Sequence, residues 1–165
     1  MALLRGLFLG FLVLAVVPSV SQAAVAVRFV GAERFYDEDF RSASKREALT
    51  RELSRFLGTL GGRYLPPGQT LSIDILDVSL AGRNEPWRRT AADVRVMRES
   101  TPPRIRLRYV LSERGRVLRQ AEETLLDWDY LSNVSARNSS EWLPYEKAML
   151  RDWFRRRFGD LAPRC

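Results

Sequence analysis

Histidine is absent from this sequence of 165 residues, and the only cysteine is its last residue, Cys165. Without histidine the chain cannot build a Ser-His-Asp triad, a Cys-His pair or a histidine-based zinc or iron site. One cysteine cannot form a disulfide within the chain, so Cys165 could pair only with another chain. A Gly-rich phosphate loop ending in Lys and Ser or Thr is also missing. We therefore expect no catalytic residue, no metal site and no cofactor.

Long apolar runs are missing too, apart from one near the N-terminus. Residues 7–17 are all apolar or glycine, with Arg5 before them and Pro18 after them. Ser21 and Ala23 place small residues at the two positions that a signal peptidase reads. The run is short for a membrane span, which needs about 20 residues. The pattern predicts a secretory signal that is cleaved after Ala23.

Cleavage at that point would remove residues 1–23 and leave 142 residues (165 − 23), a length that suits one domain. Ala24 stands where a lipoprotein would need cysteine, so we expect a free exported protein with no transmembrane segment in the mature chain. The domain is predicted to cover residues 24–160, followed by a short tail at 161–165.

Lysine is scarce as well, since it occurs only at Lys45 and Lys147 and arginine supplies the rest of the 27 basic residues. With 20 acidic residues, the net charge is +7. Such an excess favours anionic partners. For an exported protein we expect an anionic envelope component or another envelope protein, and no nucleic acid. A high-GC coding bias would give the same arginine richness without any partner.

The most regular pattern in the chain covers residues 71–82. Apolar residues alternate with polar ones up to Ile75, which is typical of a strand with one buried face. The alternation then moves by one residue at Leu76 and Asp77, and this slip predicts a β-bulge. The direction of the Asp77 carboxylate stays open.

After Gly82 the chain becomes abruptly polar and basic. A buried strand that leads into a loop of arginines around a tryptophan is where we expect a ligand to bind. Arginines recur on other elements, so what distinguishes this loop is the tryptophan among charges. The predicted ligand-binding residues are Arg83, Trp87, Arg88 and Arg89.

Two helices are predicted. The first covers residues 45–60, because leucines and a phenylalanine recur there at three- and four-residue spacing. Ser44 and Glu47 fit a capping box at its start, and Gly61 with Gly62 is expected to end it. The second helix is predicted at Pro144–Phe158, since proline is tolerated in a first turn and the segment has an apolar side.

The clearest β-hairpin has its turn at residues 113–115, where Gly115 suits a three-residue loop. Before the turn, apolar residues alternate with arginines. The register that fits both faces of the hairpin predicts these pairs: Leu111 with Val117, Leu107 with Ala121, and Arg106 with Glu122.

Further strands are predicted at residues 25–30 and 93–97. The element order is then β-α-β-β-β-β-α. We predict an α+β single domain, with a mostly antiparallel sheet of about four to five strands and two helices packed on one face.

Carboxylates provide an alternative chemistry. Asp127 and Asp129 lie two residues apart at the end of the last strand, where they would share a face while Trp128 and Tyr130 point inward. Asp77 together with either of them could form the paired carboxylates of a polysaccharide hydrolase, about 5–10 Å apart. An ordinary strand end with exposed acids explains the same pattern. The acidic residues 33–40 are likewise predicted as a solvated turn, with an aromatic side chain packed inward.

Several segments together resemble the bacterial domain-of-unknown-function 3016 family. They are the strand at 25–30, the Leu65-Pro66-Pro67-Gly68-Gln69 turn, residues 77–82, 93–96 and 103–109, and the closing Leu143-Pro144-Tyr145-Glu146-Lys147 with Asp152-Trp153-Phe154. The resemblance covers residues 25–158. It implies a small exported protein of Gram-negative bacteria, located in the periplasm. It implies no activity, and no catalytic residue is carried over from it.

Three functions remain in view. The favoured one is a non-enzymatic envelope module that binds an anionic ligand or a partner protein at the loop after Gly82. The alternative is an envelope polysaccharide hydrolase with paired carboxylates. The third is a structural or chaperone-like module whose edge strand pairs with another chain. The first and third share most sequence features.

Overall fold

The computed structural model describes residues 23–85 and 95–162, so the predicted signal peptide lies outside the described residues except for Ala23. The helices and strands are β1 Ala24–Phe29, α1 Ala43–Tyr64, β2 Gln69–Ser79, β3 Arg83–Asn84, β4 Arg95–Val96, β5 Arg104–Glu113, β6 Arg116–Leu126, α2 Val134–Arg137 and α3 Pro144–Phe158. Short 3₁₀ helices lie at η1 Ala32–Arg34, η2 Glu38–Phe40 and η3 Tyr130–Ser132.

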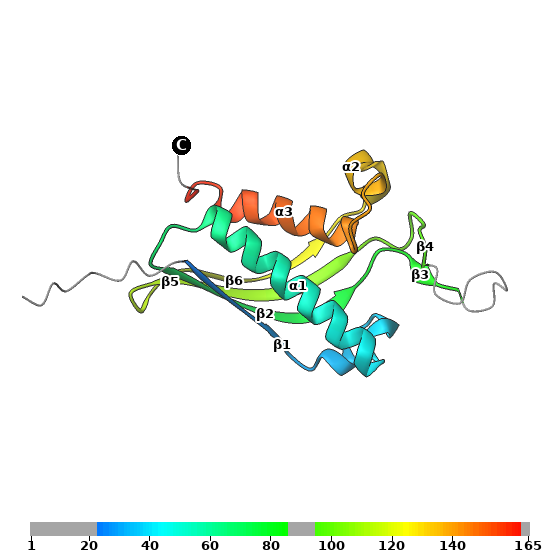
Figure 1. Cartoon of the computed structure of the whole chain (residues 1–165), viewed down its shortest axis with the longest axis horizontal. Helices are drawn as coiled ribbons and strands as arrows, with labels where there is room; N and C mark the ends of the chain where they lie inside the picture. The colour runs from blue at the N-terminus through cyan, green and yellow to red at the C-terminus, as the bar shows by residue number, and fades with distance from the viewer. Residues whose placement is uncertain (1–22, 86–94, 163–165) are drawn as a thin grey trace, which may run out of the picture.

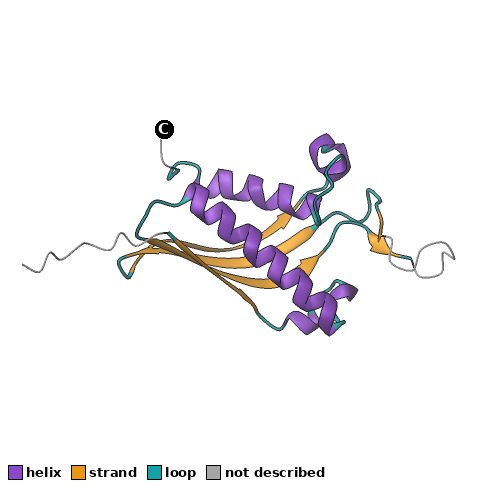
Figure 2. Cartoon of the chain, viewed as in Figure 1, coloured by secondary structure: helices purple, strands orange, loops and turns teal. Residues whose placement is uncertain are grey.

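One mixed sheet forms the base of the domain, with its strands in the order β1-β2-β5-β6. The long helices α1 and α3 both cover the same face of this sheet (Figure 1). Figure 2 shows the resulting two layers, with helices on one side and strands on the other. The predicted α+β class, the single domain and the element order are confirmed. The two-residue strand β3 and the four-residue helix α2 are additions to that order.

Strand β2 lies inside the sheet, parallel to β1 and antiparallel to β5. Parallel neighbours need a crossover connection, which α1 provides. The predicted bulge is confirmed, since the register between β2 and β5 shifts between Ile75 and Asp77. The slip keeps Val78 in the core, fully buried like Ile75 before it.

Helix α1 is longer than predicted at both ends. It begins at Ala43 after Ser42, whose side chain makes no capping hydrogen bond, so the predicted capping box is wrong. It also continues through Gly61, where a Cβ atom would lie 2.0 Å from Cγ2 of Val25. Glycine there lets the helix approach β1 closely, and that packing outweighs the roughly 1 kcal/mol helix propensity cost of glycine.

The hairpin of β5 and β6 forms, but the predicted register is wrong by two residues. Its turn has two residues, Arg114 and Gly115, with φ of 48° and 81°. Two positive φ values match the twist of the flanking strands, and a bulge after Leu111 adds the remaining shift. Leu111 therefore faces Arg119, and Leu107 faces Glu123.

Beyond the bulge, a shift of two residues leaves the side chains on their predicted faces of the sheet. Val117 is the exception, because it pairs with Ser112 before the bulge and is 51% exposed, so its predicted place on the core face is wrong. Arg106 lies directly opposite Thr124. The guanidinium of Arg106 nevertheless reaches the carboxylate of Glu122 at 3.5 Å. The predicted ion pair thus forms diagonally, which a long side chain allows.

Of the predicted strand at residues 93–97, Arg95 and Val96 form β4 and Met97 lies beyond its end, while residues 93 and 94 lie outside the described residues. Strand β4 pairs antiparallel with β3 in a separate two-stranded sheet, not with the main sheet.

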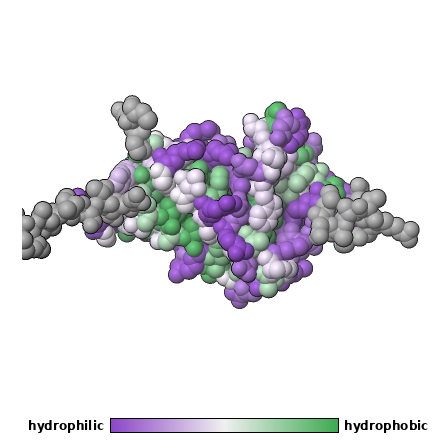
Figure 3. Space-filling model, in the orientation of Figure 1, coloured by the Kyte–Doolittle hydropathy of each residue, from purple (hydrophilic) through white to green (hydrophobic). Residues whose placement is uncertain are grey.

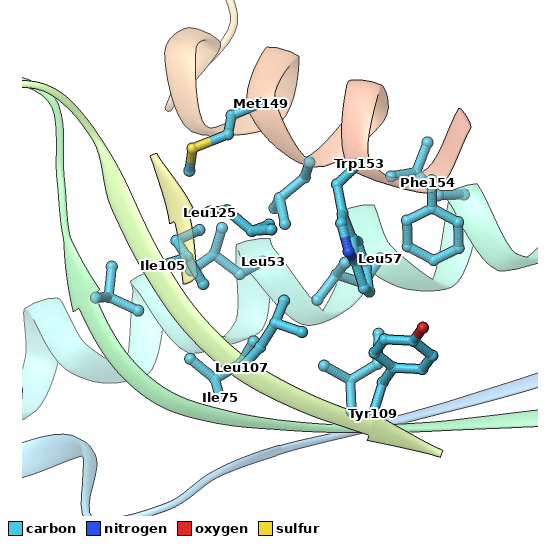
Figure 4. Close-up of a cluster of buried hydrophobic side chains, with 14 of the residues drawn as sticks. Leu53, Leu57, Ile75, Ile105, Leu107, Tyr109, Leu125, Met149, Trp153 and Phe154 are labelled. Carbon is cyan, nitrogen blue, oxygen red and sulfur yellow. The ribbon is translucent and has the colours of Figure 1, made fainter. Parts of the chain in front are cut away.

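The core lies between the sheet and the two helices (Figure 4). Trp153 and Phe154 of α3 pack edge to face with ring centroids 5.1 Å apart, and Trp153 meets Tyr109 of β5 at 5.6 Å. Leu53 and Leu57 of α1 are fully buried beneath them. The α3 bounds agree with the prediction. Figure 3 shows the molecular surface in the orientation of Figure 1, where hydrophilic and hydrophobic residues are interspersed.

The chain after β6 differs from the prediction. The strand ends at Leu126, so Asp127 and Asp129 lie in a turn and do not share a strand face. Tyr130 is fully buried as predicted, with its hydroxyl group donating to the carbonyl of Arg98 at 2.8 Å. Trp128 was expected to point inward but is 70% exposed.

Candidate functional site

A groove of about 1050 Å³ is lined by residues at the end of the sheet where β2 leads toward β3. Figure 1 shows the position of β3 at that end. The segment with η1 and η2, strand β3, the start of β5 and the turn after β6 all contribute to the lining of the groove. We call it the arginine–aromatic groove. Its defining residues are Arg34, Tyr36, Arg41, Arg83, Arg104 and Trp128.

Arg83, one of the four predicted ligand-binding residues, lines this groove. Its Nη2 donates to the hydroxyl oxygen of Tyr36 at 2.8 Å, and its guanidinium lies 6.0 Å from the centre of the Tyr36 ring. The other three, Trp87, Arg88 and Arg89, lie outside the described residues. Their role in binding stays a prediction.

Tyr36 is held between two guanidinium groups. Arg104 lies 5.6 Å from its ring centre, near the distance at which a cation is attracted to an aromatic face. The carboxylate of Asp77 fixes Tyr36 and Arg104 in place. It accepts hydrogen bonds from the Tyr36 backbone N–H at 2.8 Å and from Arg104 Nη2 at 3.0 Å. The direction of Asp77, which the sequence left open, is thereby explained. Its carboxylate positions groove residues.

A largely buried ionic cluster forms the floor of the groove, whose lining includes Arg95 and Asp37. Arg95 donates to Asp37 Oδ2 at 2.8 Å and to Asp39 Oδ2 at 2.7 Å. Burial lowers the pKa of Arg95, but the hydrogen bonds and charges of the two aspartates outweigh it, so that its pKa is raised overall. The Arg95 side chain is only 17% exposed. Charge-assisted hydrogen bonds in such surroundings are strong.

The same cluster fixes the chain between β2 and β3. Arg95 also donates to the carbonyl oxygens of Ala81 and Gly82 at 3.0 and 2.9 Å. From the other side, the buried carboxylate of Glu146 in α3 accepts from the Ala81 N–H at 2.6 Å. Burial raises the pKa of Glu146, although the Ala81 hydrogen bond lowers it. These contacts fix the backbone of Ala81 and Gly82, which lead directly into Arg83.

Within the described residues, two guanidinium groups of the groove have no carboxylate partner, and a third has only a long contact with its sequence neighbour. Arg41 and Arg83 form no ion pair there, and Arg34 has only its neighbour Glu33, at 3.7 Å. All three side chains are exposed. Guanidinium groups bind carboxylates and phosphates with two parallel hydrogen bonds. The groove can therefore receive an anion without first breaking a strong ion pair.

A comparison with known protein families shows which family this chain belongs to. Residues 23–156 match the family described as "Protein of unknown function (DUF3016)". The chain belongs to the DUF3016 family. The predicted resemblance is confirmed, and every defining residue of the groove lies within the matched part. No curated protein and no solved structure matches the chain.

None of the three carboxylates considered for hydrolysis, Asp77, Asp127 and Asp129, lines the groove of this DUF3016 domain. Asp77 is bonded to Tyr36 and Arg104, while Asp127 accepts from the backbone N–H of Asp129 at 3.2 Å. Burial raises the pKa of Asp127. The geometry gives no support to the hydrolase alternative.

Two further properties of the described residues are relevant to function. Within residues 23–85 and 95–162, no group of three or more Asp, Glu, Cys or His side chains is arranged to hold a metal ion. Among the helices of those same residues, none is both long and apolar enough to cross a membrane.

Sequence reasoning missed most of the groove. Tyr36, Arg41, Arg104 and Trp128 come from three separate segments, and only the fold brings them beside Arg83. Two features of the sequence could have indicated Tyr36 and Trp128. The acidic turn at residues 33–40 fits no helix or strand pattern, and the tryptophan at position 128 follows the end of an alternating strand.

Proposed function

We propose that this DUF3016 protein is exported to the periplasm, where its folded domain acts as a non-enzymatic module that binds an anionic ligand of the cell envelope. The observation that carries the proposal is that Arg41 and Arg83, two exposed guanidinium groups of the groove, have no carboxylate partner within the described residues. Loss of Arg5 with the signal peptide leaves 26 basic and 20 acidic residues (27 − 1 = 26; 26 − 20 = +6), and this net charge adds long-range attraction for anions. A partner protein with an acidic surface is the other ligand class that this charge favours.

The binding proposal is tested by titrating a panel of anions into the purified domain. The panel contains inorganic pyrophosphate, a galacturonic acid trimer and vesicles containing phosphatidylglycerol. The double variant Arg41→Ala/Arg83→Ala should weaken binding of the preferred probe at least tenfold, because each lost bidentate contact removes a charge-assisted pair. Isothermal titration calorimetry measures the affinities of the soluble anions, and vesicle sedimentation measures binding to lipid.

Arg116→Ala/Arg137→Ala is the matched control. Both arginines are exposed, neither lines the groove, and the change in net charge is the same. If the control weakens binding as much as the groove variant, attraction is general and the site is wrong. If no probe on the panel binds saturably, the proposed function is wrong.

Export is tested separately. Expressed from its full sequence in a Gram-negative host, the protein should be recovered from the periplasmic fraction with Ala24 as its first residue, as determined by mass spectrometry. Recovery from the cytoplasm with the N-terminal residues retained would contradict export.

A further inference from the structure

The groove presents aromatic surface as well as charge. Trp128 is 70% exposed and Tyr36 is 58% exposed, and both line the groove together with the half-exposed Leu126. By contrast, Trp153 and Tyr130 are almost completely buried in the core. Large aromatic side chains that stay exposed in a concave surface mark a place where a ligand packs.

The remaining groove residues are rich in groups that bond hydroxyls. Asn84, Ser100 and Thr101 supply amide and hydroxyl groups. Glu38 adds an exposed carboxylate, whose side chain makes no hydrogen bond or ion pair within the described residues. A carboxylate in the groove repels a compact, densely charged anion such as pyrophosphate. It accepts hydrogen bonds from hydroxyl groups, however.

We propose that the ligand of the arginine–aromatic groove is an acidic oligosaccharide. This proposal rests on the proposed function and names the ligand class. Sugar carboxylates pair with Arg41 and Arg83, a sugar ring packs its C–H face on Trp128, and ring hydroxyls donate to Glu38. A single chemistry then uses the free guanidinium groups, the exposed aromatics and the carboxylate.

The dimensions of the groove agree with such a ligand. Its volume of about 1050 Å³ is at the upper limit of small-molecule sites, which enclose roughly 300–1,000 Å³. Lining residues come from both sides, with Tyr36 and Arg41 on the η1–η2 segment and Trp128 after β6. The groove therefore has room for more than one sugar unit.

The test is a calorimetric titration of a galacturonic acid trimer into the wild-type domain and into Trp128→Ala. Loss of the indole should weaken binding about tenfold, which corresponds to about 1.4 kcal/mol. The matched control is Trp142→Ala, since Trp142 is 50% exposed and does not line the groove. It should change the affinity less than twofold. The trimer as its neutral methyl ester, and pyrophosphate, should each bind at least tenfold more weakly than the acidic trimer.

The outcomes separate this inference from the proposed function. If pyrophosphate or phosphatidylglycerol vesicles bind better than the trimer and still depend on Arg41 and Arg83, the oligosaccharide is wrong and the anion-binding function stands. Equal effects of Trp128→Ala and Trp142→Ala would also overturn the oligosaccharide. If none of these probes binds, both proposals are wrong.

Discussion

The arginines on the outer sheet face and those of the arginine–aromatic groove have different partners. On the sheet face, Arg28 binds Asp74 through two hydrogen bonds of 2.9 and 2.8 Å, and Arg108 approaches the same carboxylate at 3.5 Å. In the groove, Arg41 and Arg83 have no carboxylate partner within the described residues. The sequence shows the same residue type in both places, and only the fold distinguishes them.

The comparison teaches that arginine content alone does not locate a binding site. Strands β1, β2 and β5 place Asp74 between Arg28 and Arg108 on one face, so these guanidinium groups already have a carboxylate partner within the protein. At the groove, the nearby aspartates Asp37 and Asp39 are already bound to the buried Arg95. The guanidinium groups of Arg41 and Arg83 therefore remain available to bind a ligand.

The largest expected effect is on stability, from replacing Arg95. Arg95→Met removes the cation between Asp37 and Asp39 and leaves two carboxylates in a largely buried cluster. Breaking such a pair costs about 3–5 kcal/mol. Urea unfolding followed by circular dichroism measures this loss. Arg106→Met on the sheet face is the control, where an exposed pair contributes at most about 1 kcal/mol. If both variants lose the same free energy of unfolding, the buried Arg95 cluster contributes no more to stability than the exposed ion pair of Arg106.

A smaller effect is expected at Glu146, with a dependence on pH. Because burial raises its pKa in the folded state, the native protein keeps this proton to higher pH than the unfolded chain does. Stability is therefore lost as pH rises from about 4.3, the ordinary value for glutamate, through the folded pKa. Glu146→Gln cannot ionise and can still accept from Ala81. Its stability relative to the wild type should increase between pH 4 and pH 8 in urea unfolding. A difference independent of pH would contradict this.

A loss of at most about 1 kcal/mol at pH 7 is expected for Asp74→Asn on the sheet face. The hydrogen bond from Arg28 lowers the pKa of Asp74 in the folded state. Its stabilising contribution is therefore complete above the unfolded pKa of about 3.9 and disappears as pH falls through the lower folded value. Thermal unfolding from pH 7 down to pH 2 should show the two proteins converging. Continued separation at the acid end would contradict the assigned pair.

The smallest effect on stability belongs to the groove. Arg41→Ala/Arg83→Ala should change the free energy of unfolding by less than about 0.5 kcal/mol, because exposed side chains without ion pairs contribute little. The same urea titration measures it. A loss as large as that of Arg95→Met would mean that these arginines support the fold and are not reserved for a ligand.

Much of the fold followed from local patterns. Alternation that changed parity at Leu76 predicted the bulge in β2, and proline with an apolar stripe located α3. Where prediction was wrong, a contact between distant segments decided the structure. Gly61 reads as a helix end until Val25 of β1 is placed against it. The hairpin register depended on a two-residue turn and a bulge, and the alternation of apolar and polar residues indicates neither of them.

The groove was much less predictable. Arg83 was found because an arginine–tryptophan loop follows a buried strand. Tyr36 and Trp128 were not found, since their role depends on the distance between the η1–η2 segment and the turn after β6. Trp128 was even expected in the core, because a tryptophan beside a strand end is usually buried. Its exposure is visible only once β6 is seen to end at Leu126.

One nuclear magnetic resonance titration tests the central distinction most directly. Arginine side-chain Nε–Hε signals are recorded while the galacturonic acid trimer, the anion that the groove is expected to prefer, is added to millimolar concentration. The signals of Arg41 and Arg83 should shift saturably, while those of Arg28 and Arg106, already paired with carboxylates, should not. If the sheet-face signals shift as much as the groove signals, the free groove arginines are not a binding site.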